Sequence, residues 1–448
     1  MSPAGVPQGT GGIATDRLPV LTYAFHMQAW KREVLRRYFP ERTFVFVPFF
    51  LSETQLRKDW LDRIDLTASP EIFVWSLNLP ETVRAFAHLN AIPVHVVEDG
   101  FIRSAVPHAG RTPPLSLIVD RQTAYFDSRT ASDLEDILQH HDFEGDPLLM
   151  ERARQAMALL LSTGISKYNA PLREVALPYG PKRKRRVLAL GQVDGDASIR
   201  FGCPRPVTNE DMVRQAVAEN PDAEVIYKPH PDVLSGVRSS SADLSELARI
   251  CTVLTDRIPL SRAFETIDHV YAITSLAGFE ALLRGLPVTV LGLPFYAGWG
   301  LTEDRQTTAR RQRRLTIEQV FAATYLLYPR YFEPETGENT TFEAVIGDLR
   351  RPVAPAFAYR KPPSWHASGP YGVMGWRHAL APIIAAAVRQ VATAEDADYY
   401  RHYPIDFFRE RPEPAFRTIG RLLYPFNERP DQQSDAPFRL LPEGQSPR

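Results

Sequence analysis

The stretch VYAITSLAGFEALLRGLPVTVL, residues 270–291, sets the fold class. Val270–Thr274 is apolar and rich in residues that favour strands, and Leu276–Arg284 then follows a helical period. A Gly-Leu-Pro turn follows, and Pro287–Leu291 is typical of a second buried strand. A strand, a helix and a strand in so short a run predict a βαβ unit of a parallel sheet.

The same alternation runs through most of the chain. In the second half, strands are also predicted at Val187–Leu190 and Glu224–Tyr227, and a helix at Asn209–Ala218. The first half has strand patterns and helical patterns at Leu18–Tyr23, Trp30–Tyr38, Thr43–Phe50, Ile72–Ser76, Glu81–Leu89, Pro93–Val97, Leu115–Asp120 and Leu148–Gly164. We therefore predict an α/β protein with two Rossmann-like domains that face a cleft, followed by a C-terminal extension.

The domain boundaries follow from changes in composition. We expect a flexible N-terminus over residues 1–17, an N-terminal Rossmann-like domain over 18–180 and a C-terminal one over 181–350. The basic run at 180–186 is an interdomain linker in this scheme, and a solvated charge run explains it equally well. A return helix with Thr316 as its N-cap closes the second domain, and residues 351–448 form an extension rich in Pro, Arg and aromatic residues.

Composition excludes several classes of protein. The formal net charge of the 448 residues is −1, which gives no global attraction to nucleic acid. The two cysteines form no CxxC or His/Cys cluster, so neither a structural zinc site nor a disulfide framework is expected. The apolar segment 379–392 is too short to span a membrane, and no signal peptide is evident, so we expect a cytoplasmic protein.

Polar side chains follow several predicted strands. GQVDGDASIR, residues 191–200, places Gln192, Asp194 and Asp196 after one strand, where two glycines let the backbone bend toward a ligand. YKPHPD, residues 227–232, presents Lys228 and His230 between prolines, a rigid display suited to a phosphate or carboxylate. An ordinary turn remains the alternative for the first stretch, and a structural histidine for the second.

Two further stretches continue this pattern. Ser275 opens the helix of the βαβ unit, where free N–H groups attract anions, and Glu280 lies within reach of ribose hydroxyls. The alternative is an ordinary βαβ unit. LPFYAGWGLTED, residues 293–304, places Tyr296 and Trp299 in a loop that either lines a sugar or base or packs at the surface.

HVVEDGFIRS, residues 95–104, places Glu98 and Asp99 at the end of a strand of the first half, with Arg103 nearby. A tight Asp-Gly turn is the simple explanation. Because ligands of such sheets bind at the carboxyl ends of the strands, the polar groups of the two halves together predict one interdomain site. An anionic nucleotide sugar suits these side chains.

The same stretches, in order from about Leu18 to Asp348, resemble the capsule polysaccharide biosynthesis proteins of the KpsC/LipA type. The resemblance implies a glycosyltransferase-B fold and a retaining β-Kdo transferase that uses CMP-β-Kdo and a lipid-linked or Kdo-terminated acceptor. It implies no metal and no cofactor besides the donor. Such a protein would work with capsule assembly and export proteins, with peripheral association at the inner membrane left open.

The resemblance also implies roles for the residues. Asp196 would be the nucleophile, with Asp194 the competing choice, and Glu98 and Asp99 would be acid/base candidates on the acceptor side. The implied donor-binding residues are Gln192, Lys228, His230, Pro231, Ser275, Glu280 and, at the sugar carboxylate, Arg103.

One departure and two alternatives remain. Full-length KpsC proteins carry two transferase modules, whereas this chain has one set of motifs and is expected to form one type of linkage. The residues also allow a transferase of the same fold that uses another nucleotide sugar. A non-catalytic export or scaffold protein would instead tolerate substitution of Asp196 and His230.

Overall fold

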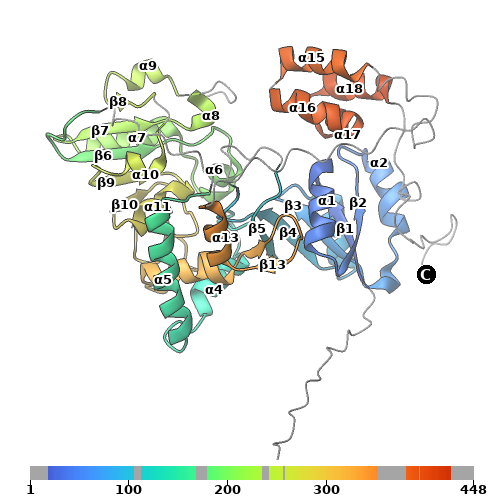
Figure 1. Ribbon diagram of the computed structural model, residues 1–448, viewed down its shortest axis with the longest axis horizontal. Helices are drawn as coiled ribbons and strands as arrows, with labels where there is room; N and C mark the ends of the chain where they lie inside the picture. Colours follow the sequence, from blue (N-terminus) through green and yellow to red (C-terminus); the bar gives the residue numbers. More distant parts are fainter. Residues whose placement is uncertain are drawn as a thin grey trace, which may run out of the picture.

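The computed structural model describes residues 19–104, 112–167, 179–234, 242–255, 258–350, 380–392 and 394–424 (Figure 1). These residues form a mixed α/β fold with two sheets, which lie on opposite sides of the view in Figure 1. The predicted flexible N-terminus, residues 425–448 and the start of the predicted extension lie outside the described residues.

The first sheet has the strand order β13-β12-β5-β4-β3-β1-β2. Its strands are β1 Val20–Phe25, β2 Arg42–Phe46, β3 Glu71–Trp75, β4 Val94–Asp99, β5 Ser116–Asp120, β12 Arg330–Phe332 and β13 Asn339–Thr340. The helices of this half are α1 Ala29–Tyr38, α2 Glu53–Gln55, α3 Glu81–Leu89, α4 Asp133–His140 and α5 Pro147–Thr163, with a π-helical turn at Leu56–Trp60 and 3-10 turns at Leu61–Arg63 and Leu66–Ala68.

The prediction of a parallel sheet holds for only part of this first sheet. β2, β1, β3 and β4 are parallel, but β5 pairs antiparallel with β4, and β12 pairs antiparallel with β5. Antiparallel neighbours need no crossover helix, and the described residues between β4 and β5 contain none. The chain also returns from its second half, so residues 330–340 complete the first sheet rather than the second.

The second sheet is parallel throughout its described strands, in the order β11-β10-β9-β6-β7-β8. The strands are β6 Arg186–Leu190, β7 Glu224–Lys228, β8 Thr252–Val253, β9 His269–Ala272, β10 Val288–Val290 and β11 Glu303–Asp304. The helices are α6 Ala197–Gly202, α7 Asn209–Glu219, α8 Pro231–Leu234, α9 Leu244–Leu247, α10 Leu260–Ala263, α11 Leu276–Leu283, α12 Ile317–Phe321, a π-helical continuation at Ala322–Leu327, and α13 Phe342–Leu349.

Capping explains where the predicted helices begin. Thr316 is the N-cap of α12, as predicted: its hydroxyl accepts from the backbone N–H of Gln319, whose side chain accepts from the Thr316 N–H in return. Asp146 caps α5 with its side chain alone, which accepts from the Leu149 N–H at 3.0 Å, and Gly164 ends that helix in the left-handed conformation at φ 65°.

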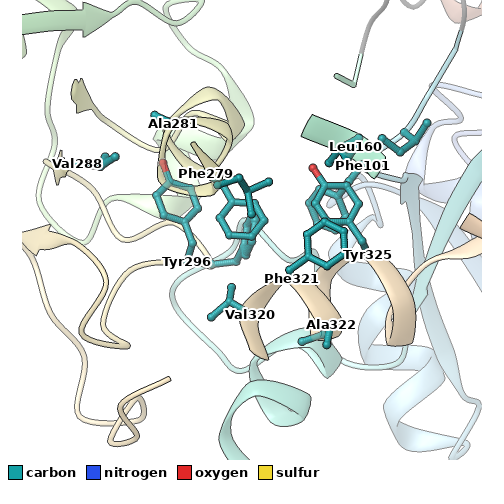
Figure 2. Close-up of a cluster of buried hydrophobic side chains, with 14 of the residues drawn as sticks. Phe101, Leu160, Phe279, Ala281, Val288, Tyr296, Val320, Phe321, Ala322 and Tyr325 are labelled. Atoms are coloured by element: carbon teal, nitrogen blue, oxygen red, sulfur yellow. The ribbon is translucent and has the colours of Figure 1, made fainter. Parts of the chain in front are cut away.

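One hydrophobic core joins the two halves of the molecule. Phe101, just after β4, packs against Phe295 and Tyr325 of the second half, with ring centroids 5.2 and 5.8 Å apart. Figure 2 shows this cluster, in which Phe279 of α11 also stacks on Tyr325. These rings are buried together in a cluster that spans both halves, while each half also has a core of its own.

The described part of the extension is a helical bundle that packs on α1 (Figure 1). It consists of α15 Ala381–Val391, α16 Ala394–His402, α17 Pro404–Glu410 and α18 Pro414–Leu423. Within the described ranges, no helix combines the length and hydropathy that a bilayer crossing needs.

Candidate functional site

Three adjacent strands of the second sheet end in polar side chains. β7, β6 and β9 are parallel neighbours, so their carboxyl ends share one edge of the sheet. Lys228 is the last residue of β7, the loop carrying Gln192 follows β6, and Ser275 lies three residues after β9. From β6 the strands are added in one direction, through β7 and β8, and from β9 they are added in the other, through β10 and β11. Open α/β sheets bind ligands at such a point of reversal, here between β6 and β9.

Gln192 joins two of these strand ends. Its side-chain amide donates to the hydroxyls of Ser198 and Thr274, at 3.1 Å each, and its Oε1 accepts from the Thr274 N–H at 2.8 Å. The buried side chain therefore uses both ends of its amide inside the protein. It orients the loop after β6 relative to the end of β9, and its predicted contact with the donor stays a prediction.

The two candidate nucleophiles have different surroundings. Asp196 is the N-cap of α6: its Oδ1 accepts from the backbone N–H and the hydroxyl of Ser198, both at 2.7 Å. Asp194 Oδ1 accepts from Asn209 Nδ2 at 2.9 Å, and that amide also donates to the Gln192 carbonyl oxygen at 2.8 Å. Both carboxylates are held in place at the same strand end, so the choice between them stays open.

Lys228 has the properties of an anion-binding residue. It is only 8% exposed, and its side chain forms no hydrogen bond or ion pair with the described residues. Burial lowers the pKa of its ammonium group. A buried cation without a partner is costly, and an anionic ligand would remove that cost.

His230 and Pro231 follow directly. The His230 carbonyl oxygen accepts from the N–H groups of Val233 and Leu234, so His230 precedes the short helix α8, which Pro231 opens. The half-buried His230 side chain thus lies two residues beyond Lys228 at the same strand end. The predicted contact of this pair with cytidylate remains a prediction.

Ser275 is the N-cap of α11, with its hydroxyl accepting from the Ala277 N–H at 3.2 Å. Tyr296, which was a candidate for lining a sugar, is instead fully buried and donates to the Ser275 carbonyl oxygen at 2.6 Å. Trp299 is also fully buried. The structure therefore supports a packed loop rather than one whose Tyr296 and Trp299 line a sugar or base. The hydrogen bond of Tyr296 holds the start of α11 in place.

Glu280 is buried inside the molecule. Its Oε2 has no hydrogen-bond partner among the described residues and lies 3.9 Å from the Arg284 guanidinium. Burial raises the pKa of this carboxyl to about 7, while Arg284 and a backbone hydrogen bond from Lys167 act in the opposite direction. One buried oxygen of this carboxyl thus lacks a hydrogen-bond partner, and the predicted contact of Glu280 with ribose is untested.

Glu98 and Asp99 lie at the carboxyl end of β4. Burial, and then repulsion by Asp99, raise the pKa of Glu98, whereas Lys167 and Lys31 lower it. Asp99 Oδ1 lies 3.1 Å from Nε of Arg103, a close ion pair whose atoms are not aligned for a hydrogen bond. A carboxyl with a raised pKa holds its proton more readily than an exposed one, which suits an acid/base role.

Arg103 is fully buried and donates from its guanidinium to the Thr112 carbonyl oxygen at 2.7 Å. Together with Asp99, these partners explain Arg103 as a structural residue. Its predicted role at the sugar carboxylate stays a prediction.

The acids of the first sheet approach α11 of the second half. Lys167 lowers the pKa of Glu98 through its charge, and its backbone N–H bonds to Glu280. A second contact joins the halves at Ser128, whose hydroxyl donates to the carbonyl oxygen of Phe201 in α6 at 2.9 Å. Residues after β4 and β5 therefore lie beside the helices that follow β9 and β6.

Sequence reasoning missed two residues of this network, Asn209 and Thr274. Asn209 starts α7 and bridges Gln192 and Asp194, and Thr274 bonds to Gln192 across the strand ends. Thr274 had a signal, because it follows a predicted strand immediately before Ser275. Within the described ranges, no three His, Cys, Asp or Glu side chains gather as a set that could hold a metal ion.

Comparison with known proteins places the chain in a family. Residues 72–331 match the family described as "Capsule polysaccharide biosynthesis protein". The chain is 42% identical over 341 residues to the lipopolysaccharide-processing protein LpsZ of Rhizobium meliloti, covering 75% of each. It is 39% identical over 340 residues to the capsule polysaccharide modification protein LipA of Neisseria meningitidis serogroup B, covering 75% of this chain but 46% of that protein.

Solved structures agree. The fold is similar to that of KpsC from Thermosulfurimonas dismutans described as a beta Kdo 2,4 transferase, with TM-score 0.61 and 32% identity over 74% of this chain and 98% of that one. A second KpsC structure, described as a beta Kdo 2,7 transferase, gives TM-score 0.58 and 32% identity over 73% and 98%. The chain belongs to the capsule polysaccharide biosynthesis protein family and is of the KpsC/LipA type.

Proposed function

We propose that this protein is a glycosyltransferase of capsule polysaccharide biosynthesis that moves Kdo from CMP-β-Kdo to a lipid-linked or Kdo-terminated acceptor. The proposal includes a glycosyltransferase-B arrangement and retention of the β configuration. It is supported by family membership and by the similarity to two structures described as Kdo transferases. The chain spans 46% of the LipA proteins it matches, so the transfer reaction proposed here concerns only the part of those proteins that this chain matches.

The observation that carries the proposal is the unpartnered, buried Lys228 at the shared edge of β7, β6 and β9. His230 follows on the same strand end, and the N-terminus of α11 with Ser275 lies on the other side of β6. An ammonium and free helix N–H groups are the donors that a phosphate prefers. In this scheme the edge holds the phosphate of CMP, and the available carboxylate oxygen of Glu280 accepts from ribose.

Retention can follow a front-side route or two displacements at the anomeric carbon, and the carboxylates at the two strand ends suit the second. In the first displacement, a carboxylate oxygen of Asp196, or of Asp194, forms a bond to that carbon, and CMP leaves with the electron pair of the broken C–O bond. In the second displacement, an acceptor hydroxyl forms the new glycosidic bond, and the carboxylate leaves as the anion it was. Glu98, helped by Asp99, takes the proton of the acceptor hydroxyl, for which its raised pKa is suited.

The test is a transfer assay with the purified full-length chain. CMP-Kdo and a synthetic acceptor ending in Kdo are incubated with the enzyme, and product and CMP are followed by mass spectrometry. We expect an acceptor longer by one Kdo and an equal amount of CMP. A panel of UDP- and GDP-sugars identifies another donor, and absence of turnover with every donor would favour a non-catalytic protein.

A further inference from the structure

Lys31 is a second buried cation whose ammonium has no hydrogen-bond acceptor among the described residues. It lies in the first turn of α1, directly after β1, and its side chain is 9% exposed. Its Nζ lies 2.9 Å from the centroid of the Trp75 ring, yet it forms no hydrogen bond or ion pair with the described residues. An ammonium has three donors, so a nine-tenths buried one with no acceptor leaves room for an acceptor from a ligand.

Acids of β4 face this lysine. The charges that act on Lys31 come from Asp99 and Glu98 at the end of β4, from Arg103 in the loop that follows, and from Glu410 in α17. Burial lowers the pKa of Lys31 to about 7 and raises that of Glu98. Four side chains, called the Lys31 subsite below, thus lie together: Lys31, Trp75, Glu98 and Asp99.

The topology explains why these residues meet. β1, β3 and β4 are parallel neighbours, with Phe25 opposite Val74 and Trp75 opposite Val97. The Lys31 subsite therefore occupies the carboxyl edge of the first sheet, as the phosphate-binding residues occupy that of the second. His26 and Ser76, the residues after β1 and β3, both adopt a left-handed φ of 55°, which costs free energy in residues other than glycine.

The C-terminal bundle holds the helix turn that carries Lys31. The N–H of Ala29, the first residue of α1, donates to Glu410 Oε1 at 2.8 Å and to the Tyr399 hydroxyl at 3.2 Å. Tyr399 in turn donates to Glu410 Oε2 at 2.6 Å. Gln28, the N-cap of α1, makes no side-chain capping hydrogen bond. Tyr399 and Glu410 of the bundle accept from the helix N-terminus in its place.

We propose that the Lys31 subsite binds hydroxyl groups of the acceptor saccharide, and that the C-terminal bundle completes the acceptor side of the enzyme by positioning α1. Sugar hydroxyls both donate and accept, so they match an ammonium beside two carboxylates, and an indole ring offers an apolar surface for sugar C–H groups. This inference rests on the proposed transferase function. It gives the extension a task in the reaction.

The first experiment separates acceptor binding from donor chemistry. Lys31→Met is compared with the control Lys58→Met, which changes an exposed lysine of the same half. We expect Lys31→Met to raise KM for the acceptor at least about tenfold, while CMP release without acceptor and CMP affinity stay unchanged. An unchanged acceptor KM in the folded variant would overturn the proposal.

The second experiment needs no turnover. A synthetic Kdo disaccharide is titrated into the wild type and Lys31→Met, with binding followed by saturation-transfer NMR. Binding that Lys31→Met abolishes supports the subsite even if CMP-Kdo proves not to be the donor. Failure of the wild type to bind, or equal binding by both proteins, contradicts it whether or not the transfer assay succeeds.

The role of the bundle has its own test. Glu410→Ala should raise the acceptor KM several-fold and leave acceptor-independent CMP release unchanged, because it removes the cap of α1 and touches no donor residue. Glu413→Ala, which changes a half-exposed partner of Arg411, is the matched control. A loss of both activities in proportion, at equal folded fraction, would mean that Glu410 is merely structural.

Discussion

Replacing Lys228 by methionine tests the donor site without disturbing the fold. Methionine keeps the unbranched shape of the side chain and removes the charge. The Lys228 side chain has no hydrogen bond or ion pair with the described residues, so the substitution breaks neither kind of interaction. Burial lowers its pKa, which shows that the folded protein disfavours the charged form. The free energy of unfolding should therefore stay the same or rise.

Binding should change in the opposite direction. A hydrogen bond between a charged donor and a phosphate contributes about 1.5–3 kcal/mol, which corresponds to roughly 10- to 150-fold weaker CMP binding in Lys228→Met. Titration calorimetry with CMP measures the affinity, and thermal unfolding without ligand measures stability. The control is Lys182→Met, because Lys182 is more than a third exposed and pairs with Asp268 in the same half. Equal CMP affinity in wild type and Lys228→Met would refute the reasoning.

Three further predictions test other parts of the account. Asp196→Asn keeps an N-cap and removes the nucleophile, so the transfer rate should fall by about 10³-fold or more with CMP affinity unchanged. Asp194→Asn is the matched control, and a larger loss of transfer in Asp194→Asn than in Asp196→Asn would assign the nucleophile to Asp194 instead. Gly278→Ala places Cβ closer to the Tyr296 hydroxyl than van der Waals contact allows and should lower the free energy of unfolding by about 1–3 kcal/mol, whereas an unchanged melting temperature would contradict this contact. Burial raises the pKa of Glu410 from 4.5 to about 8, so between these pH values the native state binds a proton that the unfolded state does not. The free energy of unfolding should therefore fall as pH rises through this range, by up to about 1.4 kcal/mol per pH unit. Glu410→Gln should flatten this slope when unfolding is measured in urea, and an equal slope in both proteins would count against the prediction.

Periodicity was sufficient to predict most elements but not all of their pairing. β3, β9 and α11 lie within two residues of the predicted ranges, because strand and helix periods are local properties. The antiparallel direction of β5 depends on a connection without a crossover helix, and the return of β12 to the first sheet depends on contacts far apart in sequence. A local sequence pattern therefore predicts neither the direction of β5 nor the sheet that β12 joins.

The site could be predicted to the level of strand ends. The positions of Lys228 and Ser275 beside one another's strand ends were predicted because parallel strands bring their carboxyl ends to one edge, while their contact with a ligand stays a prediction. The burial of individual side chains could not be predicted from the sequence. Arg103 and Trp299 have the chemistry of ligand-binding residues, but both side chains are fully buried. Lys31 was not predicted as a site residue, because the local sequence of α1 does not show that Glu410 of the distant helix α17 caps the first turn of α1.

The central claim is that the shared edge of β7, β6 and β9 holds the phosphate of a cytidylate donor. A crystal structure of the protein with CMP tests it most directly. We predict density for the nucleotide with its phosphate within hydrogen-bond distance of Lys228 and of the N-terminus of α11. CMP bound at another place, with this edge empty under saturating ligand, would contradict the account.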